Sequence, residues 1–92
     1  MTTPTVTVYT QPDCVQCDRT KKWLDDPKRG NLAGQYSTVD LAQDPQALAA
    51  VKSLGYMAAP VVIVNRTGDT QDEQHWYGFR PDMLAQFCKT AA

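Results

Sequence analysis

Two cysteines near the start of the chain, Cys14 and Cys17, are separated by two residues in the stretch TQPDCVQCDRT. This spacing is compatible with three kinds of chemistry: half of a metal site, a structural disulfide, or a pair of thiols that cycles electrons. The rest of the chain has to distinguish among these alternatives.

A zinc site would need two more ligands besides the C-x-x-C pair. The candidates are His75 and Cys88, which do not have the spacing of a zinc knuckle. We expect His75 at the surface of a strand, and Cys88 on the apolar stripe of a helix, where a cysteine packs as a small hydrophobe. We therefore disfavour a metal site, and keep a metal-binding or non-catalytic interaction module as an alternative.

Composition excludes several classes of protein. The chain has 92 residues with 42% hydrophobic content, which suits a single domain over residues 1–92. A net charge of −1 lacks the basic footprint of a nucleic-acid binder. The apolar run 56–64 contains Pro60 and is too short to span a membrane, and the N-terminus does not have the pattern of a signal peptide.

The compartment and the cysteine count bear on the disulfide alternative. Because the sequence has neither a run long enough to span a membrane nor the pattern of a signal peptide, we expect a cytoplasmic protein, which we take to be a monomer. Three cysteines are too few for a disulfide scaffold. A reducing cytosol also disfavours a permanent disulfide, so a transient, functional one stays open.

The hydrophobic pattern predicts the element order β-α-β-α-β-β-α. Strands are expected at 5–9, 35–40, 61–65 and about 75–78, and helices at 14–25, 45–54 and from 81 onward. A helical crossover joins the first two strands, which should be parallel, whereas a loop joins the last two, which should be antiparallel. The expected fold class is therefore α/β, with a small mixed sheet and helices on its faces.

The predicted helices differ in their apolar stripes. In the first helix the stripe is thin, with Cys17 and Leu24, and Trp23 lies off it and is expected to cover a polar loop at 27–34. The other two helices have broader stripes at helical spacing. These stripes are Leu48, Val51 and Leu54, between the N-cap Asp44 and the terminating Gly55, and then Leu84, Phe87, Cys88 and Ala91.

The C-x-x-C falls where the first strand meets the first helix. Unsatisfied N–H groups and the positive end of the helix macrodipole favour a thiolate on Cys14. Cys17 is one turn further, faces inward, and can attack a mixed disulfide formed at Cys14, as thiol–disulfide exchange requires. Asp13 opposes the thiolate by its charge, and we expect it to be an N-cap or a solvated turn residue.

Three stretches of the chain have a recognisable combination of motifs: TVYTQPDCVQC, LGYMAAPVVIV and HWYGFRPDML. In this order and at this spacing, over nearly the whole chain, they resemble the NrdH-redoxins, which are thioredoxin-fold proteins with glutaredoxin-like sequence. The resemblance implies a thioredoxin fold, with a mixed four-stranded sheet and three helices. It also implies a CVQC dithiol that cycles electrons, with no bound cofactor.

The resemblance further implies a function and its partners. The chain would be a protein-disulfide reductase, reduced by thioredoxin reductase and donating electrons to class Ib ribonucleotide reductase, with no nucleic-acid or membrane partner. Cys14 would be the nucleophile and Cys17 the resolving thiol. Ala59-Pro60 matches the cis-proline site beside the disulfide, where the backbone of Ala59 can pair with an incoming peptide, although Pro60 also fits a strand-start proline.

The partner-binding residues implied in this way are Val15, Gln16, Met57, Ala59, Pro60, Trp76, Gly78, Phe79 and Arg80. Two features depart from the family. Tyr77 stands where the signature W-S-G-F-R-P-D has serine, so its hydroxyl either replaces the serine or changes the local network. The loops at 27–34 and 66–73 also look longer than is usual for the family.

A glutathione-dependent glutaredoxin is the alternative within the same chemistry. Glutaredoxins commonly have a lysine three residues before the first cysteine, where this chain has Gln11. They also place Gly-Gly and an acidic residue where this chain has the stretch 77–80, which includes Arg80. The charged groups expected to hold glutathione are therefore largely missing.

Overall fold

A four-stranded sheet of order β2-β1-β3-β4 lies at the centre of the computed structural model, which describes residues 5–57, 59–65 and 73–88. The elements are β1 (Thr5–Thr10), α1 (Val15–Asp25), β2 (Ser37–Asp40), α2 (Pro45–Ser53), β3 (Val61–Asn65), β4 (Gln74–Tyr77) and α3 (Pro81–Phe87). β1 is parallel to β2 and antiparallel to β3, and β3 is antiparallel to β4. The predicted element order and strand directions are confirmed.

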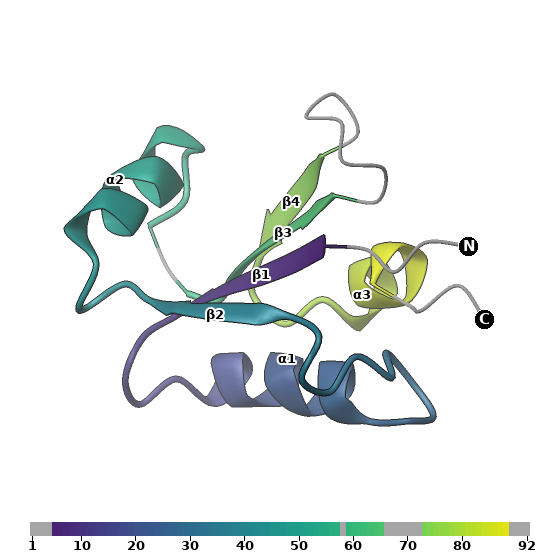
Figure 1. Ribbon diagram of the computed structural model, residues 1–92. Coiled ribbons are helices and arrows are strands. Elements are labelled where there is room, and N and C mark those ends of the chain that lie inside the picture. The colour runs from purple at the N-terminus through teal and green to yellow at the C-terminus, as the bar shows by residue number, and fades with distance from the viewer. Residues whose placement is uncertain (1–4, 58, 66–72, 89–92) are drawn as a thin grey trace.

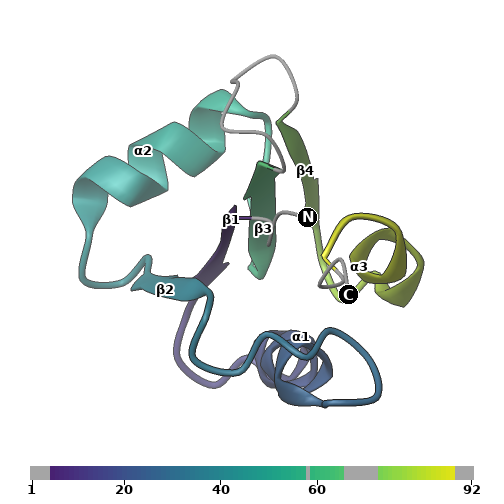
Figure 2. The same cartoon turned by 45° about the vertical axis from the view of Figure 1, so that its right-hand side comes forward.

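The helices cover the two faces of the sheet unequally. α1 and α3 lie on one face and α2 lies on the other (Figures 1 and 2). The predicted positions on residues 66–72 and at Ala91 fall outside the described part of the chain. None of the helices in the described ranges is long and apolar enough to cross a membrane.

The main hydrophobic core lies between the sheet and the α1–α3 layer. Alternate residues of β1 and β3 face it, as period-two patterning predicts. Its buried members are Val6, Val8, Trp23, Leu24, Leu32, Val62, Val64, Trp76, Leu84 and Cys88. The predicted burial of Cys88, which is 0% exposed, is confirmed.

The second core, under α2, is small and consists of Leu41, Val51 and Val61. The predicted buried stripe of α2 is wrong at its two ends, since Leu48 and Leu54 are 36% and 37% exposed. On a helix these two residues lie about 60° to either side of Val51. A narrow contact with the sheet therefore buries the middle of the stripe and leaves its flanks at the surface.

The stretch after α1, predicted as a polar loop, also supplies part of the main core. Leu32 is fully buried, and its N–H donates to the carbonyl of Leu24 at 2.8 Å. Gly30 lies against Trp23, where a Cβ atom would be 3.0 Å from the indole ring. The predicted contact of Trp23 with this loop is confirmed, but the prediction that Trp23 lies off the apolar stripe of α1 is wrong, because its side chain is buried in the main core.

Candidate active site

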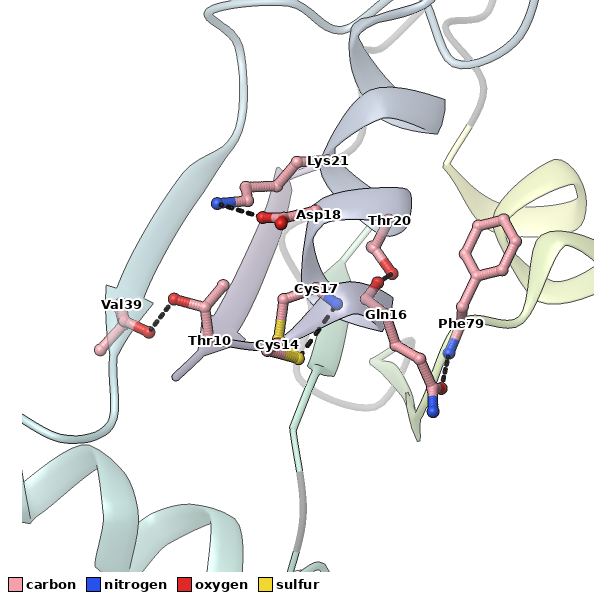
Figure 3. Close-up of a disulfide and its surroundings, with 9 residues drawn as sticks. All are labelled: Thr10, Cys14, Gln16, Cys17, Asp18, Thr20, Lys21, Val39 and Phe79. Atoms are coloured by element: carbon pink, nitrogen blue, oxygen red, sulfur yellow. Dashed lines mark hydrogen bonds and ion pairs between the residues drawn. A yellow bond between two sulfur atoms is a disulfide. The ribbon is translucent and has the colours of Figure 1, made fainter. Parts of the chain in front are cut away.

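Cys14 and Cys17 form a disulfide at the start of α1, with their Cα atoms 5.2 Å apart, inside the usual range for disulfides. Cys14 is the N-cap of the helix, and its Sγ accepts a hydrogen bond from the backbone N–H of Cys17 at 3.1 Å (Figure 3). Cys14 is partly exposed, whereas Cys17 is 1% exposed. The predicted asymmetry, an accessible first sulfur and an inward-facing second sulfur, is confirmed.

The helix start gives the Cys14 sulfur a favourable setting for negative charge. A backbone N–H group of the first turn already points at it, and the helix dipole adds positive potential at this end. Asp18 opposes this effect, but it forms an exposed ion pair with Lys21 at 3.7 Å (Figure 3). The arrangement favours the thiolate form of Cys14 once the disulfide is reduced.

Asp13 is a turn residue and is not the N-cap. It is exposed and has a positive φ of 55°, a backbone conformation that Asp adopts more readily than most residues. The N-cap position predicted as one possibility for Asp13 is taken by Cys14. The other possibility, a solvated turn, is confirmed.

The Ala59–Pro60 peptide bond is cis, as predicted. Pro60 is buried, and its carbonyl accepts a hydrogen bond from the N–H of Gly78 at 2.8 Å. The strand register pairs Val61 with Tyr9, so Pro60 lies near the end of β1 that leads toward Cys14. Peptide pairing by the backbone of Ala59 stays a prediction.

Gln16 joins the first turn of α1 to the loop between β4 and α3. Its Oε1 accepts a hydrogen bond from the N–H of Phe79 at 3.0 Å (Figure 3). Gly78 permits this contact, because its φ is +82° and a Cβ atom there would lie 3.2 Å from the same oxygen. Gln16 was predicted to be a partner-binding residue, and this positioning role could not be predicted from local sequence because Phe79 is 63 residues away.

Two exposed apolar side chains lie near the disulfide site, one next to Cys14 and one beside the loop that precedes it. Val15, which follows Cys14, is 66% exposed, and Met57, three residues before Pro60, is 90% exposed. Met57 lines one pocket with residues of the loop that precedes Cys14, and a second pocket with Tyr77. The predicted partner-binding residues Val15 and Met57 are therefore available to a partner.

Tyr77, at the position of the family's serine, belongs to an aromatic cluster on the surface. It is 56% exposed, and its ring lies 5.7 Å from that of Tyr56. The hydroxyl of Tyr56 is 2.8 Å from Nδ1 of His75. This cluster joins the segment after α2 to β4 through residues far apart in the sequence, so local patterns do not predict it.

Trp76 and Arg80 are placed differently from the rest of the predicted partner-binding set. Trp76 is 4% exposed and stacks on Phe87 in the main core, so almost none of its surface is open to direct contact with a partner. Arg80 is exposed and forms a two-point ion pair with Asp82, at 3.2 and 3.0 Å. The hydrogen bond between them raises the pKa of Arg80 and lowers that of Asp82.

The predicted alternative ligands of a metal site do not form a cluster. In the parts of the chain that the structure describes, no group of three His, Cys, Asp or Glu side chains is placed to hold a metal ion. His75 is at the surface of β4, as predicted, and Cys88 is buried at the end of α3. The Cys14–Cys17 disulfide, with its accessible Cys14 sulfur, can undergo thiol–disulfide exchange.

Comparisons with a family model and with individual proteins both show similarity to glutaredoxin-like proteins. The glutaredoxin family model matches residues 6–68. The chain is 35% identical over 79 residues to the glutaredoxin-like protein NrdH of Escherichia coli, which covers 86% of this chain and 83% of that protein. It is 32% identical over 81 residues to the protein of the same name from Lactococcus lactis subsp. cremoris, covering 88% and 96%.

Solved structures show the same fold. The NrdH-redoxin from Escherichia coli matches with a TM-score of 0.69 and 33% identity, over 88% of this chain and 91% of that chain. Thioredoxin from Trypanosoma brucei brucei, at 21% identity, matches with a TM-score of 0.62 over 90% and 69% of the two chains, which bears on the fold alone. The predicted thioredoxin fold is confirmed.

Proposed function

Because the chain belongs to the NrdH-redoxins, a group of glutaredoxin-like redox proteins, we propose that it is a reductase of protein disulfides. It receives electrons from thioredoxin reductase and delivers them to class Ib ribonucleotide reductase, in the cytoplasm, as a monomer and without a bound cofactor. One observation carries this proposal: the disulfide lies at a helix start, with an accessible sulfur on Cys14 and a buried one on Cys17. The related Escherichia coli protein is described as having a thioredoxin-like activity profile.

The reaction consists of two thiol–disulfide exchanges. In the reduced protein, the Cys14 thiolate attacks one sulfur of the target disulfide, and the other target sulfur leaves as a thiolate and takes up a proton. Cys17 then loses its proton and attacks the Cys14 sulfur of the mixed disulfide, which releases the second target thiol. The target has gained two electrons and two protons, and the Cys14–Cys17 disulfide has formed again.

Reduction of the chain reverses these exchanges. A dithiol of thioredoxin reductase attacks the Cys14 sulfur, because the sulfur of Cys17 is buried. Cys17 leaves as the thiolate and takes up a proton. The second thiol of the reductase then releases Cys14, and the reductase carries the disulfide.

A protein partner has more to contact here than glutathione has. The exposed side chains of Val15 and Met57 can be covered by an apolar partner surface, which a protein offers and a small polar peptide does not. Gln11 is neutral, and Arg80 is already paired with Asp82. Charge-assisted contacts are worth roughly 1.5–3 kcal/mol each, so loss of two of them weakens glutathione binding by ~10²-fold or more.

One observation favours the glutaredoxin alternative enough to include it in the test. Lys52 of α2 and Gln11 line the same pocket of about 320 Å³ beside Met57. This lysine provides a cation on the side of the site where glutaredoxins commonly have one before the first cysteine.

The test compares two electron donors. Oxidised protein is mixed with NADPH and thioredoxin reductase from the same organism, or with NADPH, glutathione and glutathione reductase, and NADPH consumption is followed. We expect efficient turnover with thioredoxin reductase and poor turnover with glutathione. Comparable catalytic efficiency with glutathione would contradict the proposal and support a glutaredoxin.

A second measurement addresses the metal-binding alternative. The thiols of the reduced protein are titrated in the native and in the unfolded state, and the metal content of the purified protein is measured. Two thiols that react in the native state, with no stoichiometric metal, fit the reductase. A stoichiometric metal that protects Cys14 and Cys17 would contradict it.

A further inference from the structure

The outer face of α1 has a run of cationic side chains that begins beside the disulfide. Val15, Arg19 and Lys22 are spaced by four and three residues, so they share one face of the helix. All three are exposed. The face therefore starts at the apolar residue next to Cys14 and continues into positive charge.

This face borders a groove of about 370 Å³ between α1 and the start of α3, which continues into a second groove of about 400 Å³. Trp23, Phe79 and Pro81 give the first groove an apolar lining. The two grooves share Trp23, Asp26, Arg29 and Pro81. The cations along them, here called the cationic groove, are Arg19, Lys22, Lys28 and Arg29.

The charge along the groove is unbalanced. Asp26 is the carboxylate among its lining residues, and it pairs with Arg29 at 3.4 Å. The whole chain has nine Lys and Arg and a net charge of −1, so four of these cations in one groove make a local positive excess. The helix dipole accounts for a cation in the last turn of α1, such as Lys22, but not for Arg19 or for the cations beyond the helix.

The groove is continuous with the disulfide site. Phe79 lines it, and the N–H of the same residue is hydrogen-bonded to Gln16, between the two cysteines (Figure 3). Val15 lies on the other side of the place where the groove meets the disulfide site, on the helix face that carries Arg19. A polypeptide whose disulfide is placed at Cys14 can therefore extend into the groove.

We propose that the cationic groove binds an acidic segment of the disulfide protein that this chain reduces. The inference rests on the proposed reductase function and adds the chemistry of its substrate. Positive charge with an apolar lining fits a run of Asp or Glu interspersed with apolar residues. Its position beside the reactive sulfur favours a polypeptide substrate over a nucleic acid, which has no disulfide to present.

The expected effect is on the rate of encounter, and it depends on salt. Complementary charges at the rim of an interface raise the association rate, and salt screens them. The Debye length is about 30 Å at 0.01 M salt and about 3 Å at 1 M. An advantage that comes from the groove is therefore largest at low salt and disappears at high salt.

The test uses three synthetic peptides that have the same internal Cys-x-x-Cys disulfide followed by a run of Glu, Gln or Lys residues. Reduced protein is mixed with each peptide. Cys14 attacks the peptide disulfide, Cys17 resolves the adduct, and the peptide leaves with two thiols while the protein becomes oxidised. We expect the Glu peptide to be reduced about tenfold faster than the Gln peptide at low salt, and the Lys peptide to be the slowest.

Adjacent lysines of α1 provide the matched variants. Lys22 lines the groove, whereas Lys21 points toward β2 beside Asp18, away from Phe79 (Figure 3). Lys22→Glu should reduce the advantage of the Glu peptide to about threefold, and Arg19→Glu/Lys22→Glu should abolish it. Lys21→Glu has the same net charge as Lys22→Glu and should keep most of the advantage. Reduction of each variant by dithiothreitol, and its thermal unfolding, verify that it is folded.

Several results would overturn the inference. Equal rates for the three peptides at low salt would remove the groove from substrate selection and leave the reductase activity standing. No reduction of any peptide would contradict the reductase function, and the inference with it. If single-stranded DNA bound in the same Lys22-dependent way while the Glu peptide had no advantage, the groove would be a nucleic-acid surface.

Discussion

α1 and α3 cover one face of the sheet with a cluster that contains both tryptophans, whereas the described cluster under α2, on the other face, has three buried members. The first face holds the reactive helix, because the buried side chains of Trp23 and Leu24 fix α1 about two turns beyond Cys17. The second face leaves Leu48, Leu54 and Met57 exposed. The buried side chains are therefore concentrated behind α1, whereas the α2 side leaves apolar surface exposed, most of all at Met57.

The largest expected difference between the two faces is in stability. Leu24→Ala should lower the free energy of unfolding by about 3 kcal/mol, because the side chain is fully buried and leaves a cavity. Leu48→Ala makes the same chemical change at a position that is 36% exposed, and should cost less than about 1 kcal/mol. Urea unfolding of both variants measures this. Equal losses of unfolding free energy would show that the two faces contribute equally to stability.

The next effect concerns docking on the α2 side. Met57→Asp should lower kcat/KM for reduction by thioredoxin reductase about tenfold, because it puts a charge on a 90% exposed apolar residue beside the disulfide. Reduction by dithiothreitol should be unchanged. Leu54→Asp introduces the same charge at another exposed apolar position and should have little effect. A similar loss of kcat/KM in both variants would mean that the reaction depends on net charge and not on the surface around Met57.

On the α1 side, Gln16 provides a smaller effect. Gln16→Ala removes the acceptor of the Phe79 N–H, and the expected loss of stability is about 1 kcal/mol, typical of one hydrogen bond. The loop beside the disulfide should exchange its amide hydrogens faster, and hydrogen exchange at Phe79 is the direct measurement. Gln16→Glu keeps an acceptor and should retain slow exchange at this amide. Unchanged exchange in Gln16→Ala would show that the bond does not hold the loop.

The smallest effect is on the pH dependence of stability. Tyr36 packs against the main core and donates a hydrogen bond to Asp25 at 2.9 Å. Burial, that bond and the charge of Asp25 raise its pKa from 10.0 to about 12. Since the folded pKa is the higher one, the contribution of this phenol is complete below pH 10 and is lost as the pH rises through about 12.

Tyr36→Phe tests this window. The stability difference between the two proteins, of the order of 1 kcal/mol after allowance for solvent screening, should be constant below pH 10 and shrink between pH 10 and 12. Denaturant unfolding at several alkaline pH values measures it. A difference that stays constant through this range would contradict the raised pKa.

Local patterns were sufficient for the element order and for the cysteines. Alternating residues in β1, the apolar run of β3 and the C-x-x-C at a helix start each depend on neighbours in the chain. The resemblance to a family added the cis bond at Pro60, which no periodicity reveals. The depth of burial along α2 could not be read in this way, because periodicity shows which face of a helix is apolar and not how wide its contact is.

Long-range contacts account for what the sequence did not show. The bond from Gln16 to Phe79 and the cluster of Tyr56, His75 and Tyr77 join residues that are distant in the chain. Trp76, predicted at the partner surface, faces inward because alternation along β4 places it opposite Val62 on the main-core side. The inward position of Leu32 depends on how the loop folds back on α1.

Trapping the mixed disulfide shows which thiol attacks the target and which one resolves the adduct; the proposal assigns attack to Cys14 and resolution to the buried Cys17. Reduced Cys14→Ser and Cys17→Ser variants are incubated with a peptide disulfide, quenched with acid and weighed by mass spectrometry. Cys17→Ser should accumulate one peptide adduct on Cys14, because no resolving thiol remains, and Cys14→Ser should have none and no reductase activity. An adduct on Cys17 in the Cys14→Ser variant, or turnover by that variant, would show that Cys14 is not the attacking thiol.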